Sequence, residues 1–481
     1  MTAPIAAGCM AGHGAVPRGL DSNGSSQPTH GRFGKLFTDL HKQDLTAAAQ
    51  RTLLDVIKAS GSGENSKIPA GYTYLAQFVD HDLTFDPTPQ GTRVKDPHAL
   101  KNFRTPQLDL DSLYGTGPSD QPYLYETDDS PDARVKLLTG RSFRGMLGQT
   151  KPDLPRNNDD RALIGDPRND ESVIISQLHL LFIGFHNKIV DRLRGQSDLN
   201  GDDLFRAARR IVTWHYQWIV VHDLLRLLVG KEMLTSVLRK REHFNADGDP
   251  FIPVEFAGAA FRFGHSMVRD SYAINGGKNA PIFALEDKPA RTQHLGGFRR
   301  LPIGLVIDWG LFFELTPDKP RAQLSHLIDA NVTPPLWLLP TQISGKREPL
   351  PLLNLRRASM LDVPPGPLVA TAMGAKRLNA QQLKLDNNRI SDTIRAELMA
   401  KTPLWYYILR EADALHGGEC LGPVGGRIVA ETIIGLLVSD PESYLAQDPT
   451  WTPEDPGKNK IPGVERPVSS MADLVRFVQA T

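Results

Sequence analysis

The chain has 481 residues, which is long enough for one large domain or about three ordinary ones. Its 55 basic and 55 acidic residues cancel, so no charged field favours binding to nucleic acid or to an anionic membrane surface. The two cysteines, Cys9 and Cys420, lie towards opposite ends of the chain, which excludes a disulfide framework and a thiolate metal site.

The N-terminal stretch does not match a known targeting signal. Residues 1–32 are rich in Gly, Ser, Ala and Pro, and we expect a flexible arm there. They contain neither the basic start nor the apolar core of a secretory signal. No apolar stretch of the chain reaches the roughly 18 residues that span a bilayer. We therefore expect a cytoplasmic protein without a membrane span.

From residue 33 onward, apolar residues recur at the spacing of helices, and loops rich in Gly, Pro and Asp separate them. Long loops are expected between residues 85 and 168, and a Pro-rich polar tail with a short final helix over residues 439–481. The expected helices cover residues 45–59, 76–85, 172–193, 202–229, 255–268, 352–357, 403–414 and 425–438.

The segment 76–85 places a base, two carboxylates and an amide among apolar residues. If it is helical, Gln77, Asp80 and His81 share one face, and Asp82 turns towards a neighbouring site. Such a helix suits two adjacent binding sites. A histidine between two acids is also typical of a solvated surface patch, so the segment alone leaves both interpretations open.

The segment 105–115 carries oxygen-bearing groups at alternate positions, namely Thr105, Gln107, Asp109 and Asp111. An extended or curling loop would point these groups the same way. Hard oxygen ligands of this kind, with one more carboxylate from elsewhere, suit Ca²⁺. A solvated Asp-rich turn explains the same pattern, and the alternation alone does not decide between them.

Two later segments contain further candidates. Arg168 and Glu171 stand at the entrance of the apolar helix expected over 172–193, where an ion pair is the ordinary interpretation. His179 in that helix, like the nearby His186, receives no function, because lone histidines among apolar residues usually belong to the core. In the segment 255–268, the lack of a side chain at Gly264 would let a flat macrocycle lie against the helix. The next residue, His265, could then reach the metal of the macrocycle.

Taken together, five motifs resemble those of animal-type haem peroxidases, members of the peroxidase-cyclooxygenase superfamily. They are 77–85, 105–115, Arg168 with Glu171, 262–265, and Asn354 with Arg357. The short arm and the scarcity of cysteines are similar to the bacterial branch. The resemblance implies one large, mostly α-helical haem peroxidase domain over 33–438, with long loops and very little strand. The haem would lie between the helix of His81 and that of His265.

On one side of the haem, the resemblance makes His81 the base, Gln77 the amide that orders water or halide, and Arg168 the charge-stabilising arginine. On the opposite side, it makes His265 the iron ligand and Asn354 the acceptor of its other ring N–H.

At the rim of the haem, the resemblance pairs Arg357 with a propionate, with Arg356 as the neighbouring alternative. Arg262 belongs to the same cofactor site. In the family, carboxylates at the positions of Asp80 and Glu171 form ester bonds to methyl groups of haem b. Ser172 replaces the methionine of a third linkage.

The resemblance also implies a structural Ca²⁺ site. Asp82 would join Thr105, Gln107, Asp109 and Asp111 as ligands, with residue 107 acting through its backbone carbonyl. Three carboxylates should bind a divalent cation tightly, and they should repel one another when the ion is absent.

The implied function is a peroxidase that uses hydrogen peroxide to oxidise small electron donors, such as phenols, aromatic compounds or halides, through a ferryl intermediate. A fatty-acid dioxygenase of the same superfamily is disfavoured, because Arg262 stands where those enzymes carry a radical tyrosine. A binding or adhesion protein stabilised by haem and calcium is the third interpretation. The physiological donor and the oligomeric state stay open.

Overall fold

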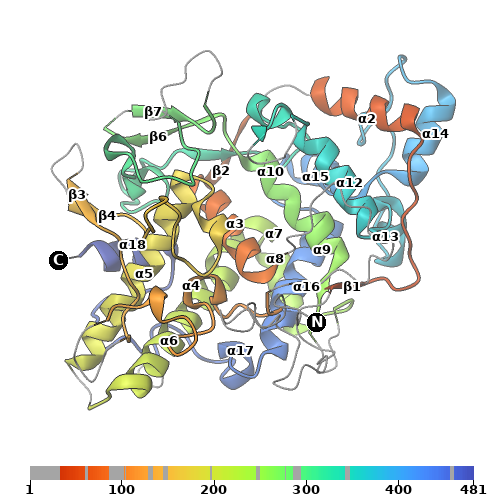
Figure 1. Ribbon diagram of the computed structural model, residues 1–481. Coiled ribbons are helices and arrows are strands. Elements are labelled where there is room, and N and C mark those ends of the chain that lie inside the picture. Colours follow the sequence, from red (N-terminus) through yellow and green to blue (C-terminus); the bar gives the residue numbers. More distant parts are fainter. Residues whose placement is uncertain are drawn as a thin grey trace, which may run out of the picture.

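The computed structural model describes residues 33–59, 63–85, 102, 104–127, 134–144, 150–195, 198–244, 250–276, 278–284, 294–341, 347–455 and 460–480. The arm expected over residues 1–32 lies outside these ranges, as does much of the loop after residue 85. Within them, the expected mostly α-helical fold with very little strand is confirmed (Figure 1).

Buried helices form the centre of the molecule. α3 (Gly71–Leu83) and α6 (Gly201–Ile219) both pack against α5 (Val173–Arg194). Stacked rings of Phe78 and Phe182, 4.8 Å apart between centroids, join α3 to α5. α5 begins after its N-cap residue, Ser172, whose side chain accepts a hydrogen bond from the backbone N–H of Ile175. The apolar residues that recur at helical spacing in α5 are therefore buried against neighbouring helices.

The remaining α-helices surround these three. They are α2 (Ala47–Ala59), α4 (Asp111–Tyr114), α7 (Arg226–Val229), α8 (Lys231–Arg239), α9 (Val254–Gly258), α10 (Gly264–Met267), α12 (Leu350–Met360), α13 (Gly366–Ala372), α14 (Asp392–Lys401), α15 (Leu404–His416), α16 (Pro423–Ser439), α17 (Tyr444–Gln447) and α18 (Met471–Gln479).

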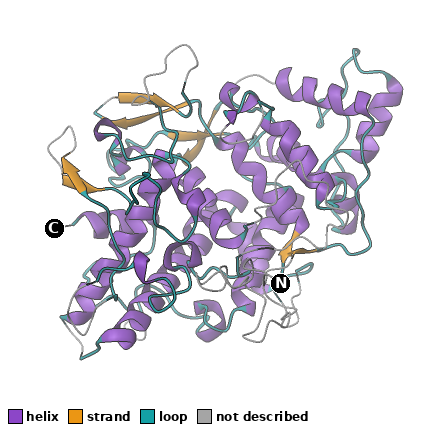
Figure 2. Ribbon diagram, in the orientation of Figure 1, coloured by secondary structure: helices purple, strands orange, loops and turns teal. Residues whose placement is uncertain are grey.

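Figure 2 shows the strands as short arrows outside the helical centre. The described residues form four two-stranded sheets. The first is parallel and the other three are antiparallel. The pairs are β1 (Phe33–Gly34) with β5 (Ile252–Pro253), β2 (Asn65–Pro69) with β8 (Leu324–His326), β3 (Ser142–Arg144) with β4 (Thr150–Pro152), and β6 (Ser271–Asn275) with β7 (Lys278–Pro281).

One described helix, α5, is long and apolar enough to cross a membrane by length and composition. Most of its apolar stretch is buried inside the protein, against α3, α6 and α18. This is the pattern of a core helix, which passes the same test of length and composition.

The helix expected over 255–268 is interrupted. α9 ends at Gly258, Ala259 leaves the helical region with φ −142°, and a 3₁₀ turn over 260–263 leads into α10. The side chain of Arg262 donates from Nε to the carbonyl of Ala257 (2.9 Å). A guanidinium thus bonds a carbonyl at the helix end, which sequence periodicity cannot reveal.

α16 is almost completely buried, and its Glu431 holds a neighbouring loop in place. The carboxylate accepts hydrogen bonds from the backbone N–H groups of Glu242 (3.0 Å), His243 (2.6 Å) and Phe244 (3.0 Å), and one from Arg427 Nη1 (3.1 Å). Burial opposes the charge, but these donors outweigh it and hold the pKa of Glu431 below its ordinary value.

Glu431→Gln should lower the free energy of unfolding by about 1–3 kcal/mol, because the amide keeps the shape but loses charge-assisted acceptance. A depressed native pKa stabilises the fold above the unfolded-state pKa and loses this effect as the pH falls through the native value. The deficit should therefore shrink in acid. Urea unfolding at several pH values measures it, with the exposed Glu454→Gln as control. Equal stability of the two variants would contradict this role.

Candidate active site

α3 brings His81 and Gln77 to one buried region. The His81 side chain is buried, and Gln77, one helical turn earlier, is half-buried. Gln77 Nε2 donates a hydrogen bond to Glu171 Oε1. The other end of this region is therefore formed by the segment just before α5.

The tautomer of His81 is set by a residue that the sequence analysis missed. His81 Nδ1 lies 2.8 Å from Asn169 Oδ1, and Asn169 Nδ2 lies 3.0 Å from His179 Nδ1. Since a carbonyl oxygen can only accept, His81 carries its proton on Nδ1 and leaves Nε2 free to act as a base. Burial, followed by the charge of Arg168, lowers the pKa of His81 to about 4, so the ring is neutral near pH 7.

Arg168 lies beside His81 and is anchored by Asp166. Its Nε and Nη2 donate to the two Asp166 oxygens (3.1 and 2.8 Å), and Nη2 also donates to the carbonyls of His81 (3.0 Å) and Thr84. Although Asp166 is fully buried, its two arginine neighbours, Arg168 and Arg104, keep its pKa well below the usual range. Among the described residues, none accepts a hydrogen bond from Arg168 Nη1. The two N–H groups of Nη1 can therefore donate to a bound group.

Glu171 does not form the ion pair with Arg168 that its position suggested. Its Oε1 lies 3.9 Å from His81 Nε2 and accepts from Gln77. Burial raises the pKa of Glu171 to about 7, with Arg168 opposing the shift. Asp80 adds to it by charge, and accepts a hydrogen bond at Oδ1 from the Thr84 hydroxyl (3.1 Å). Both carboxylates therefore flank the region beside His81.

α10, which packs against α3, carries His265. Its Nδ1 lies 3.0 Å from Asn354 Nδ2 on α12, while the buried Asn354 Oδ1 has no hydrogen-bond partner. If the amide is reversed, Oδ1 lies beside the ring and accepts from Nδ1–H of His265. His265 Nε2 is then an unprotonated ligand atom. This fits a metal on the far side of the ring, and an added Cβ on Gly264 would meet no atom within 4 Å.

Two arginines complete this side. Burial, and then the nearby charge of Arg357, lower the pKa of Arg262 to about 10. Arg356, in contrast, is exposed and pairs with Glu348 (2.7 Å). Adjacent guanidiniums favour a group with two carboxylates, which a haem provides in its propionates. The residues present therefore fit the cofactor expected from the sequence.

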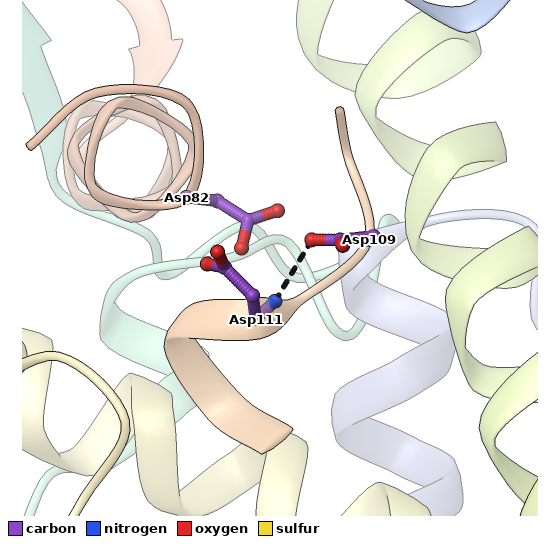
Figure 3. Close-up of side chains that lie close together, drawn as sticks. All are labelled: Asp82, Asp109 and Asp111. Atoms are coloured by element: carbon purple, nitrogen blue, oxygen red, sulfur yellow. Dashed lines mark hydrogen bonds between the residues drawn. The ribbon is translucent and has the colours of Figure 1, made fainter. Parts of the chain in front are cut away.

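Next to His81, three of the five expected calcium ligands converge (Figure 3). Asp82, Asp109 and Asp111 each offer an oxygen within 4.8 Å of the others. Burial and the two neighbouring carboxylates raise the pKa of Asp82 well above its ordinary value. Thr105 Oγ1 donates to Asp109 Oδ2 (3.2 Å). The side chain of Gln107 points elsewhere and donates from Nε2 to Asp440 Oδ1 (3.4 Å).

Three buried polar residues of this region, Asp166, Asn169 and His179, could not be assigned from the sequence. Asp166 and Asn169 lie on either side of Arg168, and His179 lies nearly two turns into α5. These positions were the only available signal, and sequence spacing does not show which side chains touch. Arg104, which lies 3.3 Å from Asp111 Oδ1 and also bonds Asp166, was missed for the same reason.

This chain is similar to known haem peroxidases in sequence. The family model for the animal haem peroxidase domain matches residues 87–308, a range that includes Arg168 and His265. Human eosinophil peroxidase is 34% identical over 196 residues, 40% of this chain and 24% of the relative. Pig (Sus scrofa) thyroid peroxidase is 23% identical over 367 residues, 72% of this chain and 38% of the relative. The chain thus spans well under half the length of these relatives.

Solved structures show the same fold at low identity. Peroxidase A from Dictyostelium discoideum aligns over 89% of this chain and 91% of its own, with a TM-score of 0.57 and 16% identity. Fatty acid alpha-dioxygenase from Arabidopsis thaliana has the same TM-score and identity over 89% and 76% of the two chains. At this identity the likeness concerns the fold alone.

Proposed function

Because the chain belongs to the animal-type haem peroxidase superfamily, we propose that it is a haem-dependent peroxidase using hydrogen peroxide to oxidise small electron donors. The observation that supports this most directly is the His81–Asn169 hydrogen bond, which leaves an unprotonated Nε2 as a general base. When bound, haem supplies the one-electron oxidising chemistry. Phenols, other aromatic compounds or halides are the donors that this proposal includes.

The residues of the site divide the remaining work. His81 Nε2 takes the proton from hydrogen peroxide and returns it to the leaving oxygen, while Asn169 keeps the ring oriented. Arg168 Nη1 is free to donate to the developing negative charge, and the anchor of this guanidinium on Asp166 fixes its direction. On the other side, His265 would hold the iron, and Asn354 would hold His265.

The dioxygenase alternative receives less support. Arg262 occupies the position of the radical tyrosine, and its side chain is tied to the backbone of α9 and lies near Arg357. To separate the two activities, the oxidation of a phenol with hydrogen peroxide should be measured beside oxygen uptake with linoleate. Peroxide-dependent turnover without lipid-dependent oxygen uptake is expected. The reverse result would overturn the proposal, and absence of both would favour a binding protein.

His81→Ala should keep haem but slow the reaction with hydrogen peroxide by roughly 10²–10⁴-fold, the usual contribution of a general base. His265→Ala should instead lose the haem, because its ligand atom is gone. Haem absorbance after gel filtration and stopped-flow mixing with peroxide measure these effects. The exposed His416→Ala is the control. An undiminished reaction in His81→Ala would exclude it as the base.

We also propose ester bonds between the haem and the carboxylates of Asp80 and Glu171. In the reaction that forms each ester, a carboxylic acid, a haem methyl group and hydrogen peroxide give the ester and two water molecules. The methyl carbon is oxidised and hydrogen peroxide is reduced. Neither carboxylate pairs with Arg168, and both flank the region beside His81. After peroxide treatment, haem should resist extraction with acidic organic solvent, and Asp80→Ala combined with Glu171→Ala should release it. Complete release from the unmodified protein would contradict the proposal.

Calcium is proposed as a structural ion at Asp82, Asp109 and Asp111, where it would relieve repulsion among buried carboxylates. At a free concentration a hundredfold above its dissociation constant, the ion should stabilise the fold by about 2.7 kcal/mol. Chelation should therefore lower the melting temperature, and added calcium should restore it. Asp111→Asn should weaken this response, whereas Asp455→Asn should leave it intact. A melting temperature unaffected by calcium would exclude the site.

A further inference from the structure

A π-helical segment, η4 (Val220–Leu225), connects α6 to α7. Such turns are rare and often lie at functional sites. Two of its side chains are hydrogen-bonded to tyrosines. Tyr72 donates to both oxygens of Asp223 (2.8 and 2.9 Å), and the Tyr444 hydroxyl lies 3.1 Å from His222 Nε2. Neither pair belongs to the proposed haem or calcium sites.

Tyr444 lies inside an aromatic cluster that is separate from the main core. Trp218 stacks on the His222 ring with centroids 3.8 Å apart, and lies 5.8 Å from the Tyr444 ring. Trp451 lies 5.7 Å from Tyr444 and 5.3 Å from Trp214. The cluster sits where α17 lies beside α6, at the lower edge of the molecule in Figure 1.

The Tyr444–His222 pair is poised for proton transfer. Tyr444 is 1% exposed, and burial raises its pKa above the ordinary value, so its hydroxyl stays protonated. Burial, and then the charge of Arg226, lower the pKa of His222 to about 4, which leaves the imidazole neutral near pH 7. When the neutral imidazole carries its hydrogen on Nδ1, Nε2 accepts the hydrogen of the phenol.

An aromatic contact joins α6, the helix that carries Trp218, to the helix of His81. Phe78 on α3 lies 6.2 Å from the ring of Tyr216 on α6, and Tyr216 precedes Trp218 by two residues. η4 also packs against α3. The π-helical segment that carries His222 thus contacts the helix that carries His81.

We propose that Tyr444, with His222 as its proton acceptor, is a second oxidation site of this protein. The Tyr444 phenol gives one electron to the peroxide-oxidised haem and its hydroxyl proton to His222 Nε2. The products are a neutral tyrosyl radical, an imidazolium and a haem reduced by one electron. A reducing donor later returns the electron, and His222 returns the proton. The inference rests on the proposed peroxidase function, which supplies the oxidant.

The half-buried Trp218 gives this site its contact with the outside. Its ring touches both His222 and Tyr444. A donor at the surface of the cluster would therefore meet an oxidising equivalent without entering the haem site. In the absence of a donor, the cluster would hold this equivalent away from the residues around His81.

The test is electron paramagnetic resonance of the haem-loaded protein, frozen shortly after one equivalent of hydrogen peroxide without a donor. A tyrosyl signal is expected that narrows with ring-deuterated tyrosine and is lost in Tyr444→Phe. His222→Gln offers a hydrogen-bond acceptor without a base, and should reduce the signal. Tyr406→Phe should leave it intact, because this buried tyrosine donates only to a backbone carbonyl (2.8 Å). Full signal in Tyr444→Phe would overturn the inference.

A second measurement does not depend on the haem. A ruthenium polypyridyl photo-oxidant, mixed with the full chain, should yield a transient tyrosyl absorbance that is lost in Tyr444→Phe and diminished in His222→Gln. If peroxide leaves the haem spectrum unchanged while this transient depends on Tyr444, the proposed peroxidase function fails and the second site stands. A transient equal in both variants and the unmodified chain would overturn the second site alone.

Discussion

The position of the buried Asp166 carboxylate constrains both proposed sites. It accepts from Arg168, which lies beside His81, and from Arg104, which reaches the carboxylate cluster at Asp111. One anion thereby couples the charge balance of the two regions. Removing one member of such a buried network leaves an uncompensated charge, at a cost of about 3–5 kcal/mol. The direction of Arg168 consequently depends on packing far from the atoms that it would stabilise.

Two histidines of the candidate site are held by the same means. Asn169 orients His81, and Asn354 orients His265. A neutral amide fixes the position of a ring proton without removing it, whereas a carboxylate would draw the ring towards an imidazolium or imidazolate. Burial lowers the pKa of each ring, so both rings are neutral near pH 7. His81 would serve as the base and His265 as the ligand.

The helical fold could be predicted from the sequence, whereas several contacts of the candidate site could not, for physical reasons. α3, α5 and α16 follow apolar periodicity, which is a local property that one sequence contains. The break at Ala259 depends on where the Arg262 side chain bonds, and that contact forms only in the folded chain. His179 was discounted because buried histidines usually belong to the core. It is a core residue, but it also bonds Asn169.

The hydrogen bonds of His81, Asn169 and His179 depend on one another. Because the Asn169 amide has one accepting and one donating end, a hydrogen on one histidine nitrogen excludes a hydrogen on its counterpart. The three side chains must therefore reverse together or not at all. A residue within an apolar helix thus takes part in choosing which nitrogen of His81 is basic. His179 is accordingly coupled to the chemistry of His81, although this residue need never touch a reactant.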